Sequence, residues 1–166
     1  SAVAGGITTF FEMPNTTPAT ITKQLLDKKY EIAKKTSVAN YSFFLGATPS
    51  NFSEIENMKG NCGLKIFMGS STGDLLVDSN EALDSIFKVC NKIIAVHAED
   101  EMILNQVAKQ NKGTKFTDHP DMRPVEAAVA ATQKAINCAL KYEKRLHILH
   151  LSTAEEVNIL RKYKST

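Results

Sequence analysis

The stretch Ile93-Ile-Ala-Val-His-Ala98 decides the fold, because a short and almost wholly apolar run is typical of a strand buried on both faces of a parallel sheet. Two similar runs, Gly63-Leu-Lys-Ile-Phe-Met68 and Leu146-His-Ile-Leu-His-Leu151, also contain a lysine or a histidine. A polar group inside a buried strand costs several kcal/mol unless it is paired or coordinated. The three runs therefore predict a shared polar site where the carboxyl ends of parallel strands meet.

Lys65, His97 and His150 are the candidates for this site. Desolvation disfavours the bare ammonium of Lys65, so this residue must be neutral, paired or chemically changed. Carbamylation by carbon dioxide would make it an anionic oxygen donor that could bridge two cations. The alternative is an ion pair with a buried carboxylate such as Glu12.

The other histidines are weaker candidates. His147 and His150 lie three apart on one predicted strand, so alternation points them to roughly opposite faces. His150 is at the strand end and is the better ligand, whereas we expect His147 to pack against a helix. His119 lies in an Asp-His-Pro segment, where a turn is sufficient to explain it.

Strand-like and helix-like segments alternate along the whole chain. The predicted strands cover 7–13, 41–47, 64–67, 93–98 and 146–151, and the predicted helices cover 22–35, 51–58, 81–90, 101–109, 124–141 and a last segment from 154. Ser50 is the expected cap of the second helix, and Ile32 is expected on the buried side of the first. This order implies right-handed βαβ units and a parallel sheet, open or closed.

Composition limits the classes of function. The 166 residues are 43% apolar, enough for one domain with a sizeable core. The net charge of +2 comes from interspersed signs, which argues against a nucleic-acid surface. No apolar run approaches the roughly 20 residues of a membrane span, and the three cysteines show no CxxC spacing. We expect a cytoplasmic protein with reduced thiols that acts on a small molecule.

The segment Met13-Pro-Asn-Thr-Thr-Pro18 follows the first predicted strand. Its two prolines stiffen a loop at the carboxyl end of that strand, which is where a side chain that binds substrate belongs. Asn15 is the candidate.

Six segments, spread in order along nearly the whole chain, carry a family resemblance. They are Ala4-Gly-Gly-Ile-Thr-Thr9, Met13-Pro-Asn-Thr-Thr-Pro18, Gly63-Leu-Lys-Ile-Phe-Met-Gly69, Val96-His-Ala-Glu-Asp100, Arg123-Pro-Val-Glu-Ala127 and His147-Ile-Leu-His-Leu-Ser152. Together they resemble dihydroorotase, a family of the amidohydrolase superfamily of metal-dependent (β/α)8 TIM barrels.

The resemblance implies a role for each matching residue. Lys65 is in the position of the carbamylated lysine that bridges two zinc ions, although some members use an aspartate bridge instead. His97 and His150 match the histidine ligands of the second metal, so one or two Zn²⁺ ions are implied. Asn15 matches the asparagine that holds the substrate carboxylate, and Arg123 matches an arginine whose role the sequence leaves open.

Other parts of the family pattern do not occur in residues 1–166. They are the His-x-His pair and substrate-binding arginine of the first strand and the aspartate general acid/base of the last strand. We therefore expect residues 1–166 to form a partial catalytic barrel, about strands two to six of eight, truncated at both ends and inactive alone. Glu12, where relatives often have Asp, is a small departure.

The reaction implied by the resemblance interconverts N-carbamoyl-L-aspartate and L-dihydroorotate in pyrimidine biosynthesis. One alternative is a dihydropyrimidinase, hydantoinase or allantoinase, but the Met-Pro-Asn-Thr motif at 13–16 argues against these enzymes. The other alternative is an inactive dihydroorotase-like scaffold that binds aspartate transcarbamoylase. The implied assemblies are a homodimer or a complex with aspartate transcarbamoylase.

Overall fold

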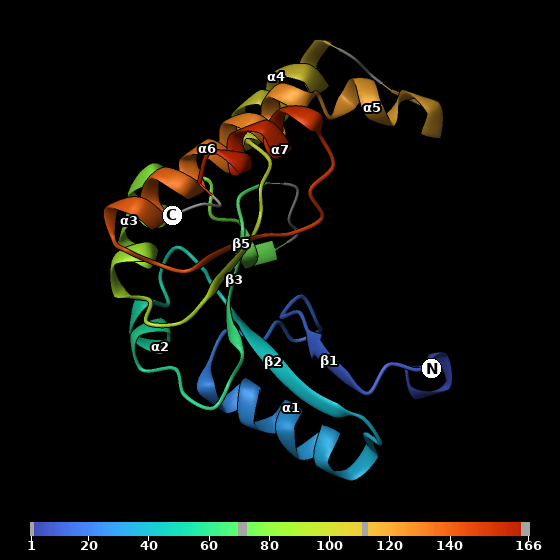
Figure 1. Ribbon diagram of the computed structural model, residues 1–166, viewed down its shortest axis with the longest axis vertical. Helices are drawn as coiled ribbons and strands as arrows, with labels where there is room; N and C mark the ends of the chain where they lie inside the picture. Colours follow the sequence, from blue (N-terminus) through green and yellow to red (C-terminus); the bar gives the residue numbers. More distant parts are fainter. Residues whose placement is uncertain (1, 70–72, 111–112, 164–166) are drawn as a thin grey trace.

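A parallel five-stranded sheet forms the centre of the computed structural model, which describes residues 2–69, 73–110 and 113–163. Each strand pairs with the next one in the chain. The strands are β1 (Thr9–Glu12), β2 (Asn40–Gly46), β3 (Gly63–Phe67), β4 (Ile94–His97) and β5 (Leu146–Ile148). The sheet curls into part of a barrel with the helices along its outer side (Figure 1). The predicted partial (β/α)8 barrel is confirmed.

The helices alternate with the strands, as expected from the sequence. They are α1 (Lys23–Thr36), α2 (Phe52–Glu56), α3 (Asn80–Val89), α4 (Glu101–Gln110), α5 (His119–Met122), α6 (Val125–Lys141) and α7 (Ala154–Arg161), with 3-10 turns at Val3–Gly5, Gly73–Leu75 and Phe116–Asp118. Hydroxyl caps start several of them: Thr22 accepts from the Leu25 amide, and Ser79 accepts from the Ala82 amide.

Two expectations about local structure are wrong. The N-cap of α2 is Asn51 rather than Ser50. Asn51 accepts from the Thr48 amide and donates to the Gly46 carbonyl, so its side chain fixes the loop after β2 instead of capping a helix amide. Ile32 of α1 is 63% exposed, because the side of α1 that is buried is centred on Leu26.

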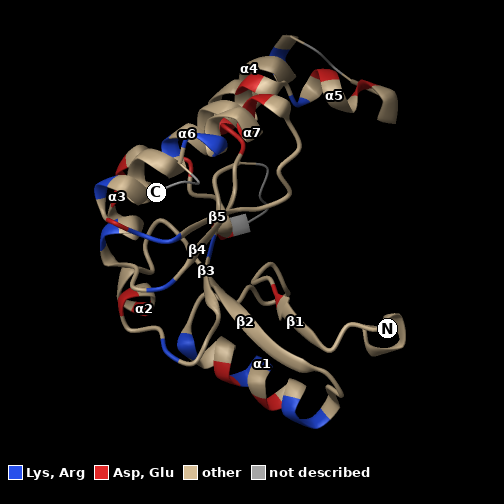
Figure 2. Ribbon diagram, in the orientation of Figure 1, with Lys and Arg blue, Asp and Glu red and all other residues tan. Residues whose placement is uncertain are grey.

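The main core lies between the sheet and the helices. Alternate residues of the central strands, Leu64, Ile66, Ile94 and Val96, are fully buried in one cluster with side chains of α3 and α6. Charged side chains lie mainly on the helices, with both signs interspersed (Figure 2). Within the described residues, no helix has the length and apolar character needed to cross a membrane.

Candidate metal centre

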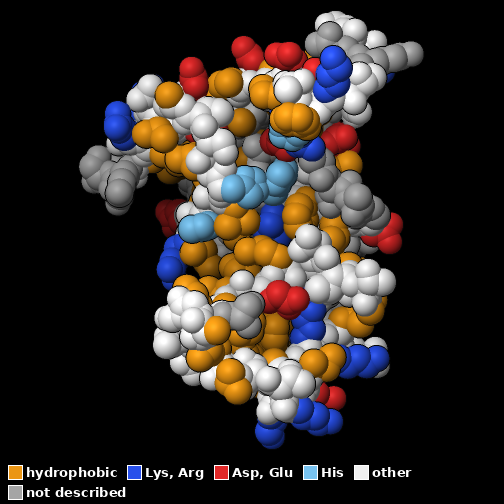
Figure 3. Space-filling view, turned by 90° about the vertical axis from the view of Figure 1, so that its right-hand side faces the viewer, with side chains coloured by type: hydrophobic (Ala, Val, Ile, Leu, Met, Phe, Trp, Pro, Cys, Tyr) orange, Lys and Arg blue, Asp and Glu red, His pale blue; other side chains and the backbone are white. Residues whose placement is uncertain are grey.

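The strand register places the predicted site residues on the inward face of the sheet. Lys65 is opposite Ala95, and Ala95 is opposite His147. His97 lies two residues beyond Ala95, so the alternation of side chains puts it on this face as well. Histidine side chains gather in the middle of this hollowed side of the molecule (Figure 3).

His97 and His150 meet directly. Their Nδ1 and Nε2 atoms are 2.8 Å apart, and their ring centroids are 4.6 Å apart. The strand β5 ends at Ile148, and His150 has a φ of 35°, so the chain turns there and brings the imidazole back towards β4. Partial burial lowers the pKa of His150, and the neighbouring His97 lowers it further. A neutral imidazole has the free lone pair that a metal ion requires.

His147 does not pack against a helix as expected. The register puts it on the same inward face as Lys65, and it is exposed there. The argument from spacing failed because the strand stops before His150, so alternation no longer fixes the direction of the later side chain.

Lys65 is 2% exposed, and its side chain runs along β3 towards the carboxyl end of the strand. Its Nζ lies 3.5 Å from the centroid of the Phe67 ring and donates to the Ile66 carbonyl at 2.6 Å. Burial lowers the pKa of the Lys65 ammonium to about 7. The charge of Lys65 also contributes, as a minor cause, to the lowered pKa of His150.

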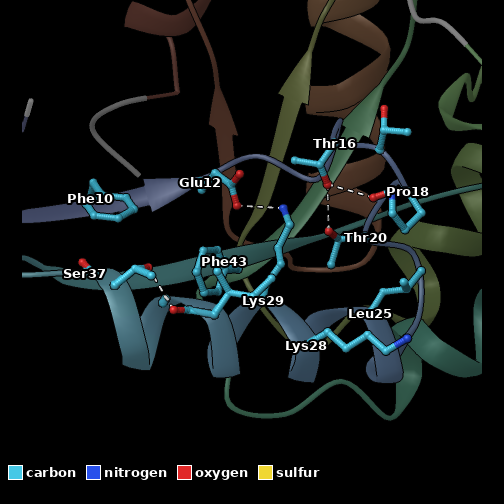
Figure 4. A pocket seen from close by; sticks show the side chains of 14 residues that line it. Phe10, Glu12, Thr16, Pro18, Thr20, Leu25, Lys28, Lys29, Ser37 and Phe43 are labelled. Atoms are coloured by element: carbon cyan, nitrogen blue, oxygen red, sulfur yellow. Dashed lines mark hydrogen bonds and ion pairs between the residues drawn. The ribbon is translucent and has the colours of Figure 1, made fainter.

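The alternative reading of Lys65, an ion pair with Glu12, is wrong. The Glu12 carboxylate lies 2.7 Å from the Lys29 ammonium instead (Figure 4). Among the described residues, no carboxylate is within ion-pairing distance of Lys65. A buried amine with a pKa near neutrality and no acidic partner is suited to react with carbon dioxide, because the neutral amine is the nucleophile.

Asn15 lies in the loop that follows β1, at the same edge of the sheet. The loop is anchored by buried Pro14 and by the Thr16 hydroxyl, which donates to the Pro18 carbonyl at 2.9 Å (Figure 4). Asn15 itself is exposed and makes no hydrogen bond to any described residue. The cavity of about 580 Å³ drawn in Figure 4 lies between β1 and α1, on the helix side of the sheet.

Glu99 and Arg123 extend the histidine pair. Glu99 accepts from His97 Nε2 at 2.7 Å, and the same carboxylate oxygen contacts the Arg123 guanidinium. Burial raises the pKa of Glu99, but the hydrogen bonds from His97 and Arg123 outweigh this effect and lower it to about 2. The sequence analysis assigned no role to Glu99, although its place two residues after His97 at a strand end was a signal. His119, at the start of α5, lines a cavity together with Arg123.

The donor set fits a metal ion but is incomplete. Two imidazole nitrogens meet on the face of the sheet where Lys65 is buried, and histidine together with a carbamate oxygen are suitable ligands for zinc. Nowhere in the described residues do three histidine, cysteine or acidic side chains form a group that could hold a metal. A complete centre thus requires Lys65 as a ligand, residues beyond the described ones, or both.

Comparisons with known proteins find relatives in both sequence and structure. A dihydroorotase from Methanosarcina acetivorans is 32% identical over 99% of this chain, which covers 36% of that protein. An allantoinase from Enterococcus faecalis is 36% identical over 92% of the chain, which covers 37% of it. The solved L-hydantoinase (dihydropyrimidinase) from Arthrobacter aurescens has a TM-score of 0.92 at 31% identity, with 99% of this chain and 38% of that one covered. No protein-family model matches this chain.

The chain is therefore similar, in sequence and in its partial barrel, to cyclic amidohydrolases. More particularly, it is similar to dihydroorotases, among which are curated relatives at 31–34% identity. The chain spans just over a third of the length of the curated relatives it matches.

Proposed function

We propose that the whole protein is a zinc-dependent dihydroorotase, which interconverts N-carbamoyl-L-aspartate and L-dihydroorotate in pyrimidine biosynthesis. The observation that carries the proposal is the 2.8 Å approach of His97 Nδ1 to His150 Nε2, on the face where Lys65 is buried with no acidic partner in the described part of the chain. Both histidines and the lysine have the identities that the dihydroorotase pattern requires at these strands.

Some residues of this chain would bind the metal, and Asn15 would bind the substrate. His97 and His150 would hold zinc through ring nitrogens, and Lys65 would hold it as a carbamate. The bound metal would supply a Lewis acid that polarises the ring amide and lowers the pKa of water. Asn15 would donate from its free amide to the substrate carboxylate and so orient the ring. The general acid/base is an aspartate outside residues 1–166.

A hydantoinase or dihydropyrimidinase is the second candidate. It is supported by the close structural likeness to the L-hydantoinase, whose TM-score is 0.92. The distinguishing feature is Asn15, because dihydroorotate carries a ring carboxylate and hydantoin and dihydrouracil do not. An amide placed to bind that carboxylate gives no advantage with the latter two substrates.

The test compares kcat/KM of the purified whole protein for dihydroorotate, hydantoin, dihydrouracil and allantoin. We expect dihydroorotate to be the best substrate. A hydrogen bond to a charged group is worth about 1.5–3 kcal/mol, so Asn15→Ala should lower kcat/KM for dihydroorotate roughly 10- to 150-fold. The metal content should not change, because Asn15 is not a proposed ligand.

Asn57→Ala is the matched control. Asn57 is also an exposed asparagine, but its amide donates only to the Ser53 carbonyl at the end of α2. Its kinetics should equal those of the wild type. Preference for hydantoin would exclude the dihydroorotase assignment in favour of its relatives. Unchanged kinetics in Asn15→Ala would show that the loop at 13–18 is structural and would remove the main reason for preferring dihydroorotase.

A further inference from the structure

We propose that Glu99, itself held by Arg123, is a positioning residue that sets the orientation and tautomer of the metal ligand His97. This inference rests on the proposed function, because it concerns the same metal centre. It adds two residues to that centre, one of them from the segment just before α6.

The contacts form a continuous chain from Arg123 to His150. One oxygen of Glu99, Oε2, accepts from His97 Nε2 at 2.7 Å and also contacts the Arg123 guanidinium. The side chain of Glu99 is only 15% exposed, so water competes little for that oxygen. The opposite nitrogen of the His97 ring, Nδ1, faces His150.

The direction of these hydrogen bonds fixes the tautomer of His97. An ionised carboxylate can only accept, so the hydrogen of the neutral imidazole must be on Nε2. Nδ1 then keeps its lone pair, and this is the nitrogen directed at His150. Metal-binding histidines commonly donate their second nitrogen to a carboxylate in this way, which orients the ring and raises its basicity.

The backbone around Glu99 is held firmly enough for this role. A Cβ on Gly69 would lie 2.5 Å from the Glu99 carbonyl oxygen, so the loop after β3 packs directly against Glu99. The next residue, Asp100, accepts from the Ile103 amide at the start of α4 and from the Lys134 ammonium at 2.6 Å. The backbone of Glu99 is therefore held on one side by its contact with Gly69 and on the other by the hydrogen bonds of Asp100.

Arg123 connects the segment before α6 to the proposed metal ligand His97. It precedes Pro124, the N-cap of α6, and lies 24 residues from Glu99 in the sequence. A guanidinium that contacts the same carboxylate oxygen as His97 holds the carboxylate in place. Arg123 would thus act on the metal ligand through Glu99.

The test measures the affinity of the metal-free whole protein for Zn²⁺, by competition with a chelator, and the visible spectrum of the Co²⁺ form. Glu99→Gln keeps the side-chain shape and one acceptor oxygen but loses the charge, and zinc affinity should fall about 10- to 100-fold. The Co²⁺ absorption should shift as the ligand field changes. Arg123→Gln should weaken zinc binding less, and the double variant should bind zinc no more weakly than Glu99→Gln alone.

Asp84→Asn is the control, because Asp84 is a carboxylate that also pairs with a cation, Lys141, and accepts from the Tyr142 hydroxyl, but on the surface. Its zinc affinity should equal that of the wild type. Urea unfolding of each metal-free protein separates loss of fold from loss of metal. If Glu99→Gln does not fold, weakened zinc binding in folded Arg123→Gln supports the proposal and unchanged binding rejects it.

The outcomes distinguish this inference from the proposed function. If the wild type binds zinc and Glu99→Gln binds it equally well with an unchanged Co²⁺ spectrum, Glu99 is not a positioning residue and the dihydroorotase proposal stands. If the wild type binds no zinc, both are rejected.

Discussion

Replacement of Lys65 by methionine should make the metal-free protein more stable at neutral pH. Lys65 is 2% exposed and has no carboxylate partner among the described residues, so folding must either bury a charge or remove its proton. Burial lowers its pKa from 10.5 to about 7. Methionine is unbranched and adaptable, and it can occupy the same space without that cost.

The size of the effect follows from proton binding. Between the folded pKa of about 7 and the unfolded value of 10.5, the unfolded chain binds up to one proton more than the folded protein. The free energy of unfolding of the wild type therefore rises with pH, by at most about 1.4 kcal/mol per pH unit. At pH 7 the Lys65 amine of the folded protein is about half protonated, so the difference in bound protons is smaller there. The free energy of unfolding of the wild type should therefore rise by about 2 kcal/mol in total between pH 7 and pH 9.

The measurement is urea unfolding of metal-free wild type and Lys65→Met in buffers without carbon dioxide. We expect the variant to be the more stable at pH 7, and its advantage to shrink by about 2 kcal/mol on going to pH 9. Lys23→Met is the control, because Lys23 lies on the surface with 68% of its side chain exposed, and it should keep the pH dependence of the wild type. A constant difference between wild type and Lys65→Met over this range would refute the reasoning.

Two further predictions concern packing and acid stability. A Cβ on Gly63 would lie 2.7 Å from the Ile93 carbonyl oxygen, so Gly63→Ala should lower the free energy of unfolding by about 1–3 kcal/mol in urea titrations. Gly5→Ala, which meets nothing within 4 Å, should change it little, and equal effects would contradict the packing argument. Burial raises the pKa of Asp100, but the hydrogen bond and charge of Lys134, together with the backbone amides of Ile103 and Met102, outweigh it and lower the pKa from 3.8, so the contribution of Asp100 to stability is present above that pH and is lost as the pH falls further. Asp100→Asn should therefore be less stable than wild type at pH 7, with a difference that narrows in unfolding titrations below about pH 4, and a difference independent of pH would count against the ion pair.

The sheet and the order of its elements could be predicted because they depend on patterns along the chain. Apolar runs such as 93–98 and intervening amphipathic segments define βαβ units whatever the side-chain details. The convergence of His97 and His150 was predictable for the same reason, since both lie at the carboxyl ends of neighbouring parallel strands.

The positions of the remaining site side chains could not be predicted, because they depend on contacts between residues that are far apart in the sequence. The inward position of His147 is set by the register of β5, and the reach of His150 by its φ of 35°. The contact of Glu99 with Arg123 joins residues 24 apart in the sequence. The choice of Lys29 rather than Lys65 as the partner of Glu12 depends on α1, which brings the Lys29 ammonium to Glu12 and the Met13 carbonyl at the end of β1.

The strictly sequential order of the sheet, from β1 to β5, affects how the protein can fold during synthesis. Every strand pairs with the next strand in the chain, so even the longest connection, which carries α4, α5 and α6 between β4 and β5, costs little more loop-closure entropy than the shorter ones. A chain that leaves the ribosome from its amino end can therefore complete one strand pairing before the next unit is made. Residues of the candidate centre would come together in the order of translation, first Lys65, then His97 and Glu99, then Arg123, and last His150.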